Sequence, residues 1–343
     1  MTAHFTFETL VARLSRILVA AGCSERVADL IAKNCASADR DGANSHGSFR
    51  LPGYVLTLRA GWVEGQATPV VEDCAASFVR IDACNGFAVP ALAAGAEMAI
   101  EKARSNGVVV VAIRNSHHLG ALSFDVEPFA EQGFIALSMV NSMKCVVPDG
   151  CARPVLGTNP LAFAAPRASG SPYVFDLATS AMAHIDVKIA RDEGRRVPDG
   201  VGVDRFGTPT GDPAAIIDGG ALCTFGGHKG TALSMMIEIM CAALVGSSFS
   251  YECDLAETPG AATPKTGQTL ILIDPEAGRV GLPPFGVRVD ELLDTVIEAG
   301  QERLPGARRL AARTRAMREG IALSAEQLRM IEALEVEFSL AGI

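Results

Sequence analysis

Strand-like runs alternate with helical patterns through the middle of this chain. Residues 108–113 (Val-Val-Val-Val-Ala-Ile) form a continuous apolar run, which is typical of a strand buried on both faces. The Ala-rich segment before it, residues 88–104, has helical spacing and ends at Asn106-Gly107. The same reasoning predicts further strands at 77–82, 134–140, 173–177 and 269–273, and further helices at 126–132, 180–193, 229–245 and 289–299. This interleaving predicts an α/β core.

Both ends of the chain are predicted to be helical. Residues 7–21 carry apolar side chains at helical spacing, and Ser24 is placed to cap a second helix that runs to about Arg40. Near the other end, Ser324 and Gln327 have the spacing of a capping box that starts a final helix. We therefore expect the two termini to pack together as a helical lobe beside the α/β core.

Composition limits the kinds of partner and the cellular compartment that are expected for this protein. The net charge of -9 disfavours nucleic acid as a partner, so an anionic ligand must be held by locally concentrated basic residues. The nine cysteines show no CxxC pair and no metal-ligand spacing, as expected of reduced thiols in a cytoplasmic protein. The first residues lack the pattern of a signal peptide. The most apolar run, 231–249, contains Glu238 and indicates a buried helix rather than a membrane span.

Residues 41–50 gather groups that can bind and protonate a carboxylic acid. Ser45 precedes His46, so its hydroxyl can tune the ring by hydrogen bonding, and the imidazole can deliver a proton near neutral pH. Arg50, four residues on, can hold a carboxylate through two parallel hydrogen bonds. A capping or core role for His46 is the alternative, and these residues alone leave both open.

Two further segments have the composition of ligand-binding turns. The glycine cluster 225–230 opens a predicted helix, and its free N–H groups together with Lys229 suit a phosphate or carboxylate. A tight turn before a buried helix explains this cluster equally well. Residues 114–122 follow a predicted strand, a place where α/β proteins commonly bind ligands. Of the adjacent His117 and His118, at most one faces a given ligand, and a structural role for the other is expected.

Three other groups are weaker candidates. The turn 156–160 exposes the hydroxyl of Thr158, which can hydrogen-bond a small polar substrate. Asp186 lies between two β-branched residues on a predicted helix, two residues after His184 and so on a different face. If Asp186 is buried it needs a partner such as a histidine, and otherwise it faces solvent. The basic stretch 301–313 can bind phosphate, or it is a solvated helix start.

Together these motifs resemble the malate/L-lactate dehydrogenase family, which is unrelated to the Rossmann-fold lactate dehydrogenases. The matching blocks are Asn44-Ser-His-Gly, Asn115-Ser-His-His, Met139-Val-Asn-Ser142, Gly157-Thr-Asn-Pro160-Leu-Ala-Phe, Phe175-Asp-Leu-Ala-Thr-Ser180, Val203-Asp, Thr210-Gly-Asp-Pro213 and Gly226-Gly-His-Lys-Gly230. Within this family the chain is most similar to the Δ1-piperideine-2-carboxylate/Δ1-pyrroline-2-carboxylate reductases. The stretches that carry this similarity include Phe49-Arg-Leu-Pro-Gly-Tyr54 and Gly300-Gln-Glu-Arg-Leu-Pro-Gly306.

The resemblance implies a role for each matching residue. His46 would be the proton donor, with Ser45 and Asp186 as its relay partners. Arg50 and Thr158 would hold the substrate carboxylate. The cofactor would be NADPH, with NADH as a weaker alternative, and no metal would take part. The residues implied to bind the cofactor are His118, Leu119, Gly120, Ala121, Leu122, Asp176, Leu177, Ala178, His228, Lys229, Arg303, Arg308 and Arg309.

The resemblance also implies the fold and the assembly. The fold would be an α/β, non-Rossmann NAD(P)-binding fold, in which a mixed sheet is flanked by helices and the two termini form a helical lobe. The helical lobe would comprise residues 1–60 and 285–343, and the α/β core with the site would comprise 61–120 and 150–284. Residues 121–149 would belong to the cofactor-binding lobe. The chain would form a homodimer whose active site lies near the interface.

The implied activity is that of an oxidoreductase acting on CH–NH groups, an imine reductase. Such an enzyme would reduce Δ1-pyrroline-2-carboxylate to L-proline and Δ1-piperideine-2-carboxylate to L-pipecolate. Three alternatives stay open: a 2-keto acid reductase (2-hydroxy acid dehydrogenase) of the same family, a ligand-binding protein without catalysis, and a metal-dependent hydrolase or lyase. The last is disfavoured because the sequence has no HxH or HExxH ligand spacing.

Overall fold

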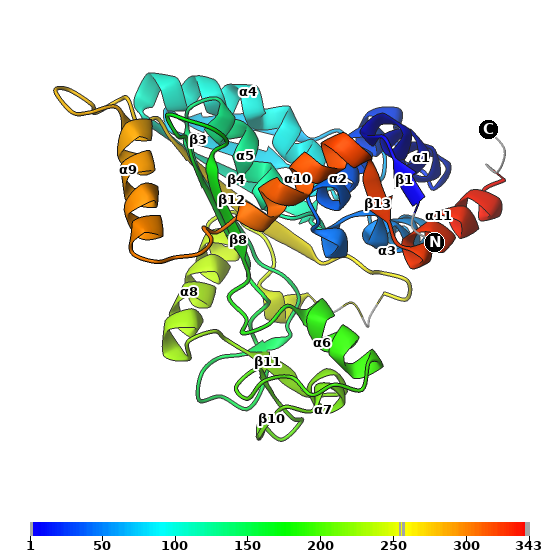
Figure 1. Cartoon of the computed structure of the whole chain (residues 1–343). Helices are drawn as coiled ribbons and strands as arrows, with labels where there is room; N and C mark the ends of the chain where they lie inside the picture. Colours follow the sequence, from blue (N-terminus) through cyan, green and yellow to red (C-terminus); the bar gives the residue numbers. More distant parts are fainter. Residues whose placement is uncertain (1–2, 254, 256–257, 340–343) are drawn as a thin grey trace.

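The computed structural model describes residues 3–253, 255 and 258–339, and a mixed sheet of seven strands lies at its centre (Figure 1). The strand order is β2-β3-β4-β12-β5-β7-β8. Only β3 and β4 are parallel, and every other neighbouring pair is antiparallel. The strands are β2 (Val70–Ala75), β3 (Phe78–Asp82), β4 (Val108–His117), β12 (Lys265–Ile273), β5 (Ile135–Val140), β7 (Leu161–Ala165) and β8 (Tyr173–Leu177). The expected mixed sheet is confirmed.

Helices cover both faces of this sheet. On one face, α4 (Ala88–Asn106) and α5 (Ser123–Glu131) bury a core that includes Val111 and Leu270. On the other face, α8 (His228–Glu238) continues into a π-helical turn, η3 (Ile239–Ala243), and buries Met139 and Cys241. Because β4 lies in the middle of a sheet covered on both sides, its sequence is a continuous apolar run.

The two termini form one helical lobe, as expected. Figure 1 shows its helices gathered at one end of the molecule. Strand β1 (Ala3–Phe5) pairs antiparallel with β13 (Ile321–Leu323). Leu14 and Ile31 from the start of the chain share a core with Ile331 from its end. The predicted capping box is formed, since Ser324 and Gln327 exchange their hydrogen bonds. The helices are α1 (Phe7–Ala20), α2 (Glu25–Arg40), α3 (Leu51–Arg59), α10 (Ala307–Glu319) and α11 (Ala325–Glu337).

A second, smaller sheet was not expected from the sequence. It has four very short strands in the order β10-β9-β11-β6, and its core includes Leu156, Val187 and Leu222. It lies below the large sheet in Figure 1. Its elements are β6 (Val146–Val147), β9 (Gly202–Val203), β10 (Pro209–Thr210) and β11 (Ala221–Cys223), with α6 (His184–Asp192) and α7 (Pro213–Ile217) beside them. Residues 150–284, expected as part of one α/β core, are therefore shared between two sheets.

Helix α9 (Phe285–Glu298), which the sequence assigns to the helical lobe, is bonded to a turn of the large sheet. Arg167 Nε donates to Asp290 Oδ1 at 2.6 Å, and Ser169 N donates to Asp290 Oδ2 at 3.0 Å. Both partners lie in the turn between β7 and β8.

In the described part of the chain, no helix has the length and apolarity needed to cross a bilayer.

Candidate active site

Ser45, His46 and Arg50 come together in two 3-10 turns directly after α2. The turns are η1 (Asn44–His46) and η2 (Ser48–Arg50). Ser45 Oγ lies 3.1 Å from His46 Nδ1, and Arg50 Nε donates to the carbonyl oxygen of Ser45 at 2.7 Å. The local sequence therefore brings the hydroxyl, the imidazole and the guanidinium into one hydrogen-bonded group.

Asp39 holds this loop against the C-terminal part of the chain. Its carboxylate accepts hydrogen bonds from Ser48 N at 2.9 Å and from Gln327 Nε2 of α11 at 3.0 Å. A Cβ at Gly47 would lie 2.0 Å from Asp39 Oδ1, so only glycine fits there. Burial raises the pKa of Asp39 to about 6, although these hydrogen bonds lower it in part. The loop is thus fixed by a buried contact between α2 and α11.

Arg50 is a largely enclosed cation without a counter-ion. Tyr54 and Cys35 are buried near it, and burial lowers the pKa of its guanidinium. Among the described residues it forms no ion pair with a carboxylate, and Nε is its only nitrogen with a protein partner. Since an enclosed charge needs compensation, this position suits an anionic ligand.

His46 is held in its neutral form in the ligand-free chain. Burial, followed by the charges of Arg50 and His118, lowers its pKa to about 4. Behind it, His118 Nε2 lies 2.9 Å from Asp125 Oδ2, which also accepts a hydrogen bond from Gln268 Nε2 at 2.8 Å. His118 therefore belongs to a buried polar network next to His46.

His117 points away from this network. Its Nδ1 lies 2.9 Å from Thr263 Oγ1 and its Nε2 lies 3.2 Å from Asn85 Oδ1. Burial lowers its pKa to about 4. Of the two adjacent histidines only His118 lies near His46, as the alternation of side chains along a strand requires.

The neutral, buried His117 makes folding sensitive to acid. A base whose pKa falls from 6.5 to about 4 on folding contributes stability above pH 6.5, and this stability is lost as the pH falls toward 4. The loss between pH 7 and pH 5 is about 2 kcal/mol for one such group. Urea unfolding at the two pH values should show a shallower decline in His117→Gln than in the wild type. His4→Gln changes an exposed histidine of strand β1 and should keep the wild-type decline. Equal declines in all three proteins would contradict the prediction.

Three of the residues expected at the cofactor lie at the end of strand β8, an edge of the large sheet: Asp176 and Leu177 are its last two residues, and Ala178 follows. Asp176 Oδ2 accepts a hydrogen bond from Ser123 N at 2.9 Å, so β8 is tied to the end of segment 118–122. Burial raises the pKa of Asp176, and the Ser123 N–H offsets part of this. Near the other end of β8, Gly306 approaches so closely that a Cβ would lie 2.4 Å from Val174 O.

The turn before α8 lies next to Thr158. Phe225 N donates to Thr179 O at 3.0 Å, and Thr179 N donates to Thr158 O at 2.9 Å. His228 and Lys229 are exposed at the start of the helix, where no side chain caps the free N–H groups. Thr158, β8 and the Gly-Gly-His-Lys turn are therefore adjacent, although they lie far apart in the sequence.

Asp186 is not joined to the Ser45-His46 pair in this structure. It is exposed in the first turn of α6, and its carboxylate forms no hydrogen bond or ion pair with the described residues. His184, at the start of the same helix, lies close enough to Arg50 for the guanidinium to lower its pKa, after burial and Lys188. The two residues lie on different faces of α6, and the face turned toward Arg50 is that of His184.

The three arginines expected at the cofactor have different surroundings. Arg303 and Arg308 are exposed and form no ion pair with the described residues. Arg309 pairs with Asp41 at 2.9 Å and with Glu127 at 2.7 Å, so its guanidinium is occupied by protein carboxylates. Only the first two are open to a ligand phosphate in this conformation.

Sequence reasoning missed the polar network behind His118. Asp125, Gln268 and Ser138 are all buried, and Gln268 Nε2 donates to Ser138 Oγ at 3.0 Å. The available signal was the polar residue Gln268 directly before the predicted buried strand 269–273, because a buried amide must find partners. No group of three or more His, Cys, Asp or Glu residues that could hold a metal ion exists among the described residues.

Known proteins resemble this chain over nearly its whole length. A reductase from Pseudomonas syringae pv. tomato named for Δ1-pyrroline-2-carboxylate and Δ1-piperideine-2-carboxylate is 58% identical over 97% of this chain and 96% of its own length. A Δ1-pyrroline-2-carboxylate reductase from Ancylobacter novellus is 39% identical over 92% of this chain and 93% of its own length.

Solved structures show the same fold. The crystal structure of Δ1-piperideine-2-carboxylate reductase from Pseudomonas syringae pv. tomato matches with a TM-score of 0.94 at 57% identity, over 97% of this chain and 99% of that one. Sulfolactate dehydrogenase from Methanocaldococcus jannaschii matches with a TM-score of 0.88 at 27% identity, over 98% of each chain. The model of the malate/L-lactate dehydrogenase family matches residues 5–332. The chain therefore belongs to the malate/L-lactate dehydrogenase family.

Proposed function

We propose that this protein is an NADPH-dependent reductase of cyclic imine 2-carboxylates. It would convert Δ1-pyrroline-2-carboxylate to L-proline and Δ1-piperideine-2-carboxylate to L-pipecolate. The observation that carries the proposal is Arg50, an enclosed guanidinium that has no counter-ion among the described residues and is hydrogen-bonded to the same loop as His46. The substrates named for the relatives combine a carboxylate with a basic ring nitrogen on the next carbon. The carboxylate matches the guanidinium of Arg50, and the ring nitrogen matches the imidazole of His46 beside it.

Arg50 binds the substrate carboxylate in this proposal. Its Nε is already used by the carbonyl oxygen of Ser45, which fixes the plane of the guanidinium. The two remaining nitrogens form a fork that matches the two oxygens of a carboxylate. The hydroxyl of Thr158, which has no hydrogen-bond partner among the described residues, is available as a further donor.

His46 holds and delivers the proton for the ring nitrogen. In the free chain its pKa is about 4, in part because of the positive charge on Arg50. A carboxylate bound to Arg50 cancels that charge, so the imidazole takes up a proton more readily once the substrate is present. Ser45 Oγ, 3.1 Å from Nδ1, orients the ring so that Nε2 faces the substrate.

The residues along β8 fit a nicotinamide dinucleotide. The uncapped start of α8 offers free N–H groups and Lys229, while Arg303 and Arg308 offer unpaired positive charge near the other end of the strand. When bound, the cofactor supplies the hydride that goes to C2 of the ring. This chain contributes the binding, the orientation of the substrate and the proton.

A two-cofactor assay tests the proposed function. Oxidation of NADPH and NADH is followed with Δ1-pyrroline-2-carboxylate, Δ1-piperideine-2-carboxylate and pyruvate. We expect the highest kcat/KM for a cyclic imine with NADPH. A higher kcat/KM for pyruvate would favour a 2-keto acid reductase instead, and NADPH binding without oxidation by any of the three would favour a binding protein.

Arg308 should decide the preference for NADPH over NADH. Because its guanidinium is exposed and unpaired, Arg308→Ala should raise the KM for NADPH about tenfold and leave that for NADH unchanged, as expected when a charge-assisted contact to a phosphate is lost. Arg309→Ala is the matched control, since its guanidinium is paired with Asp41 and Glu127 and its loss should lower stability instead. An unchanged NADPH/NADH ratio in Arg308→Ala would remove this residue from the site.

We further propose that the chain works as a homodimer. Apolar side chains of α8, η3 and the following turn are exposed in the single chain: Met235 by 52%, Ile239 by 57% and Tyr251 by 51%. Clustered exposure of this kind is typical of a surface that another subunit covers. Light scattering of the purified protein should give twice the mass of one chain, and the Ile239→Arg variant should give the mass of a single chain.

A cytoplasmic location stays a prediction of the sequence.

A further inference from the structure

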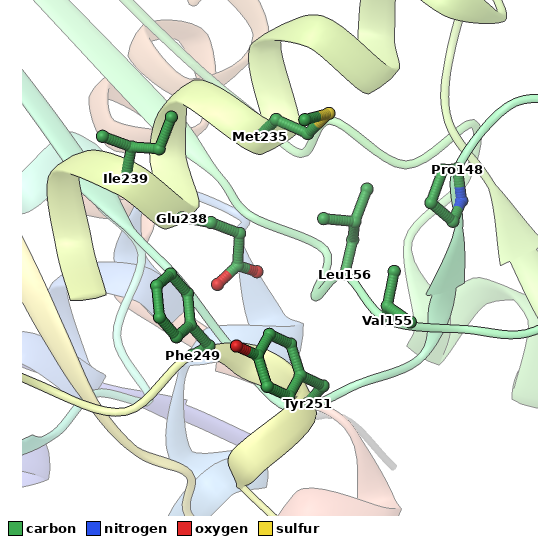
Figure 2. A pocket seen from close by; sticks show the side chains of 8 residues that line it. All are labelled: Pro148, Val155, Leu156, Met235, Glu238, Ile239, Phe249 and Tyr251. Carbon is green, nitrogen blue, oxygen red and sulfur yellow. The ribbon is translucent and has the colours of Figure 1, made fainter. Parts of the chain in front are cut away.

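Glu238 is a buried carboxylate without a basic partner. It is the last residue of α8, and its side chain is 6% exposed. It lies in the wall of a pocket of about 550 Å³. The other side chains that line this pocket are apolar, except for the Tyr251 hydroxyl (Figure 2). Among the described residues, no lysine, arginine or histidine pairs with it. A carboxylate in such a place is costly unless several donors compensate it.

Four hydrogen bonds from three separate segments compensate this charge. Oε1 accepts from Asn159 Nδ2 at 2.8 Å and from Gly157 N at 3.4 Å. Oε2 accepts from Ser250 N at 3.0 Å and from Asn141 Nδ2 at 3.2 Å. The turn before β7, the end of β5 and the turn η4 (Ser250–Glu252) therefore meet on one side chain.

The turn at 157–159 has a conformation that needs such an anchor. Asn159 is fully buried and has a φ of 39°, in the left-handed region that costs energy for any residue other than glycine. A Cβ at Gly157 would lie 2.5 Å from Asn159 Oδ1 and 2.8 Å from Ser250 Oγ, so the turn is closely packed. Glu238 bonds to the residues on both sides of Thr158.

Thr158 is thereby held with its hydroxyl unused. Its carbonyl oxygen accepts hydrogen bonds from Thr179 N at 2.9 Å and from Thr179 Oγ1 at 3.0 Å. Its hydroxyl bonds to none of the described residues. We propose that Glu238 is a positioning residue, which holds the 157–159 turn so that the Thr158 hydroxyl meets the substrate carboxylate. This inference rests on the proposed function.

Helix α8 gives this anchor a second consequence. His228 and Lys229, where we place part of the cofactor, lie at its first turn, and Glu238 lies at its last. One rigid helix thus joins the cofactor turn to the turn that carries Thr158. The carboxylate of Glu238 holds the 157–159 turn, and not the first turn of α8. Loss of its charge should therefore raise the KM for the imine acid and leave the affinity for the cofactor unchanged.

Glutamine at position 238 is the sharpest test because it has the shape of glutamate. Each carboxylate oxygen accepts from two donors, so the amide nitrogen of glutamine faces two N–H groups in either orientation. We expect Glu238→Gln to raise the KM for Δ1-pyrroline-2-carboxylate about tenfold and to change kcat less than threefold. A hydroxyl that binds the carboxylate alike in the ground and transition states affects KM alone. The Kd of NADPH, measured without the imine, should stay within twofold.

Two further variants keep the test decisive. Glu252→Gln makes the same change in the nearby turn η4, where the exposed Glu252 accepts a hydrogen bond from Phe249 N and, among the described residues, from no other donor. The KM of this variant should equal that of the wild type. Glu238→Asp keeps the charge but is one methylene shorter, so it should raise KM by a smaller factor. It carries the test if the glutamine variant does not fold.

Amide hydrogen exchange of residues 156–159 separates this inference from the proposed function. Faster exchange in Glu238→Gln than in the wild type supports the anchor whether or not the enzyme reduces cyclic imines. Unchanged exchange, an unchanged KM in both variants at position 238, or an equal rise in the Kd of NADPH overturns the inference. If the wild type reduces no cyclic imine, the proposed function fails while the exchange still decides what Glu238 holds.

Discussion

Replacing His46 by alanine should lower kcat for Δ1-pyrroline-2-carboxylate by about 10²–10⁴-fold, the range in which a general acid contributes. The physical reason is that the ring nitrogen then has no proton donor when C2 accepts the hydride. The adjacent Ser45 hydroxyl cannot replace His46, because a hydroxyl is a far weaker acid than an imidazolium. Initial rates of NADPH oxidation measure the effect. The Kd of NADPH and the thermal midpoint serve as controls, and both should stay close to the wild-type values.

The contrast with Arg50→Lys makes this result specific. A lysine keeps the charge but not the planar fork, so its main effect should be a higher KM for the imine acid with a much smaller change in kcat. An equal loss of kcat in both variants would show that the substitutions displace the loop, and that the missing imidazole of His46 is not the cause of the loss. A wild-type rate in His46→Ala would remove this histidine from the chemistry.

The second large effect concerns the ion cluster between α10, α2 and α5. Arg313 bonds to Asp41 at 2.5 Å and to Glu127 at 2.6 Å, and both acids are buried. Burial disfavours the charged Glu127, but hydrogen bonds from Arg309 and Arg313 overcome this and lower its pKa. Glu127→Gln should therefore cost about 3–5 kcal/mol of unfolding free energy, because it leaves two arginines with too little negative charge.

Urea unfolding at neutral pH measures this loss, with Glu291→Gln as the matched control. Glu291 pairs with Arg288 on the exposed side of α9, so its change should cost less than about 1 kcal/mol. Removing both partners with Glu127→Leu and Arg313→Met together should cost less than Glu127→Gln alone, since fewer uncompensated charges remain. A double variant that is less stable than the single one would contradict this explanation.

The elements that could be predicted are those whose pattern is local. The run 108–113, the caps at Ser24 and Ser324 and the Ser45-His46-Arg50 loop each depend on neighbours in sequence, and the structure has them. The small sheet could not be predicted, because strands of two or three residues carry no periodicity. Its register depends on partners far away in the chain.

The rest of the candidate site depends on long-range contacts. Nothing near Glu238 in the sequence indicates that its carboxylate meets Asn141, Asn159 and Ser250, because helical spacing reveals a face but not what covers it. The same limit applies to Asp186, whose sequence allowed either a buried or an exposed side chain. The structure has it exposed.

The pairing of β1 with β13 has a consequence for how the protein is made. The core of the helical lobe contains Leu14 and Ile31 from α1 and α2 and Ile331 from α11, so it is complete only once residue 331 has left the ribosome. Until then the side chains of α1 and α2 that pack against β13 and α11 stay uncovered, which favours aggregation. The loop with His46 is held in part by Gln327 through Asp39, so this loop too reaches its final form only after α11 has been made.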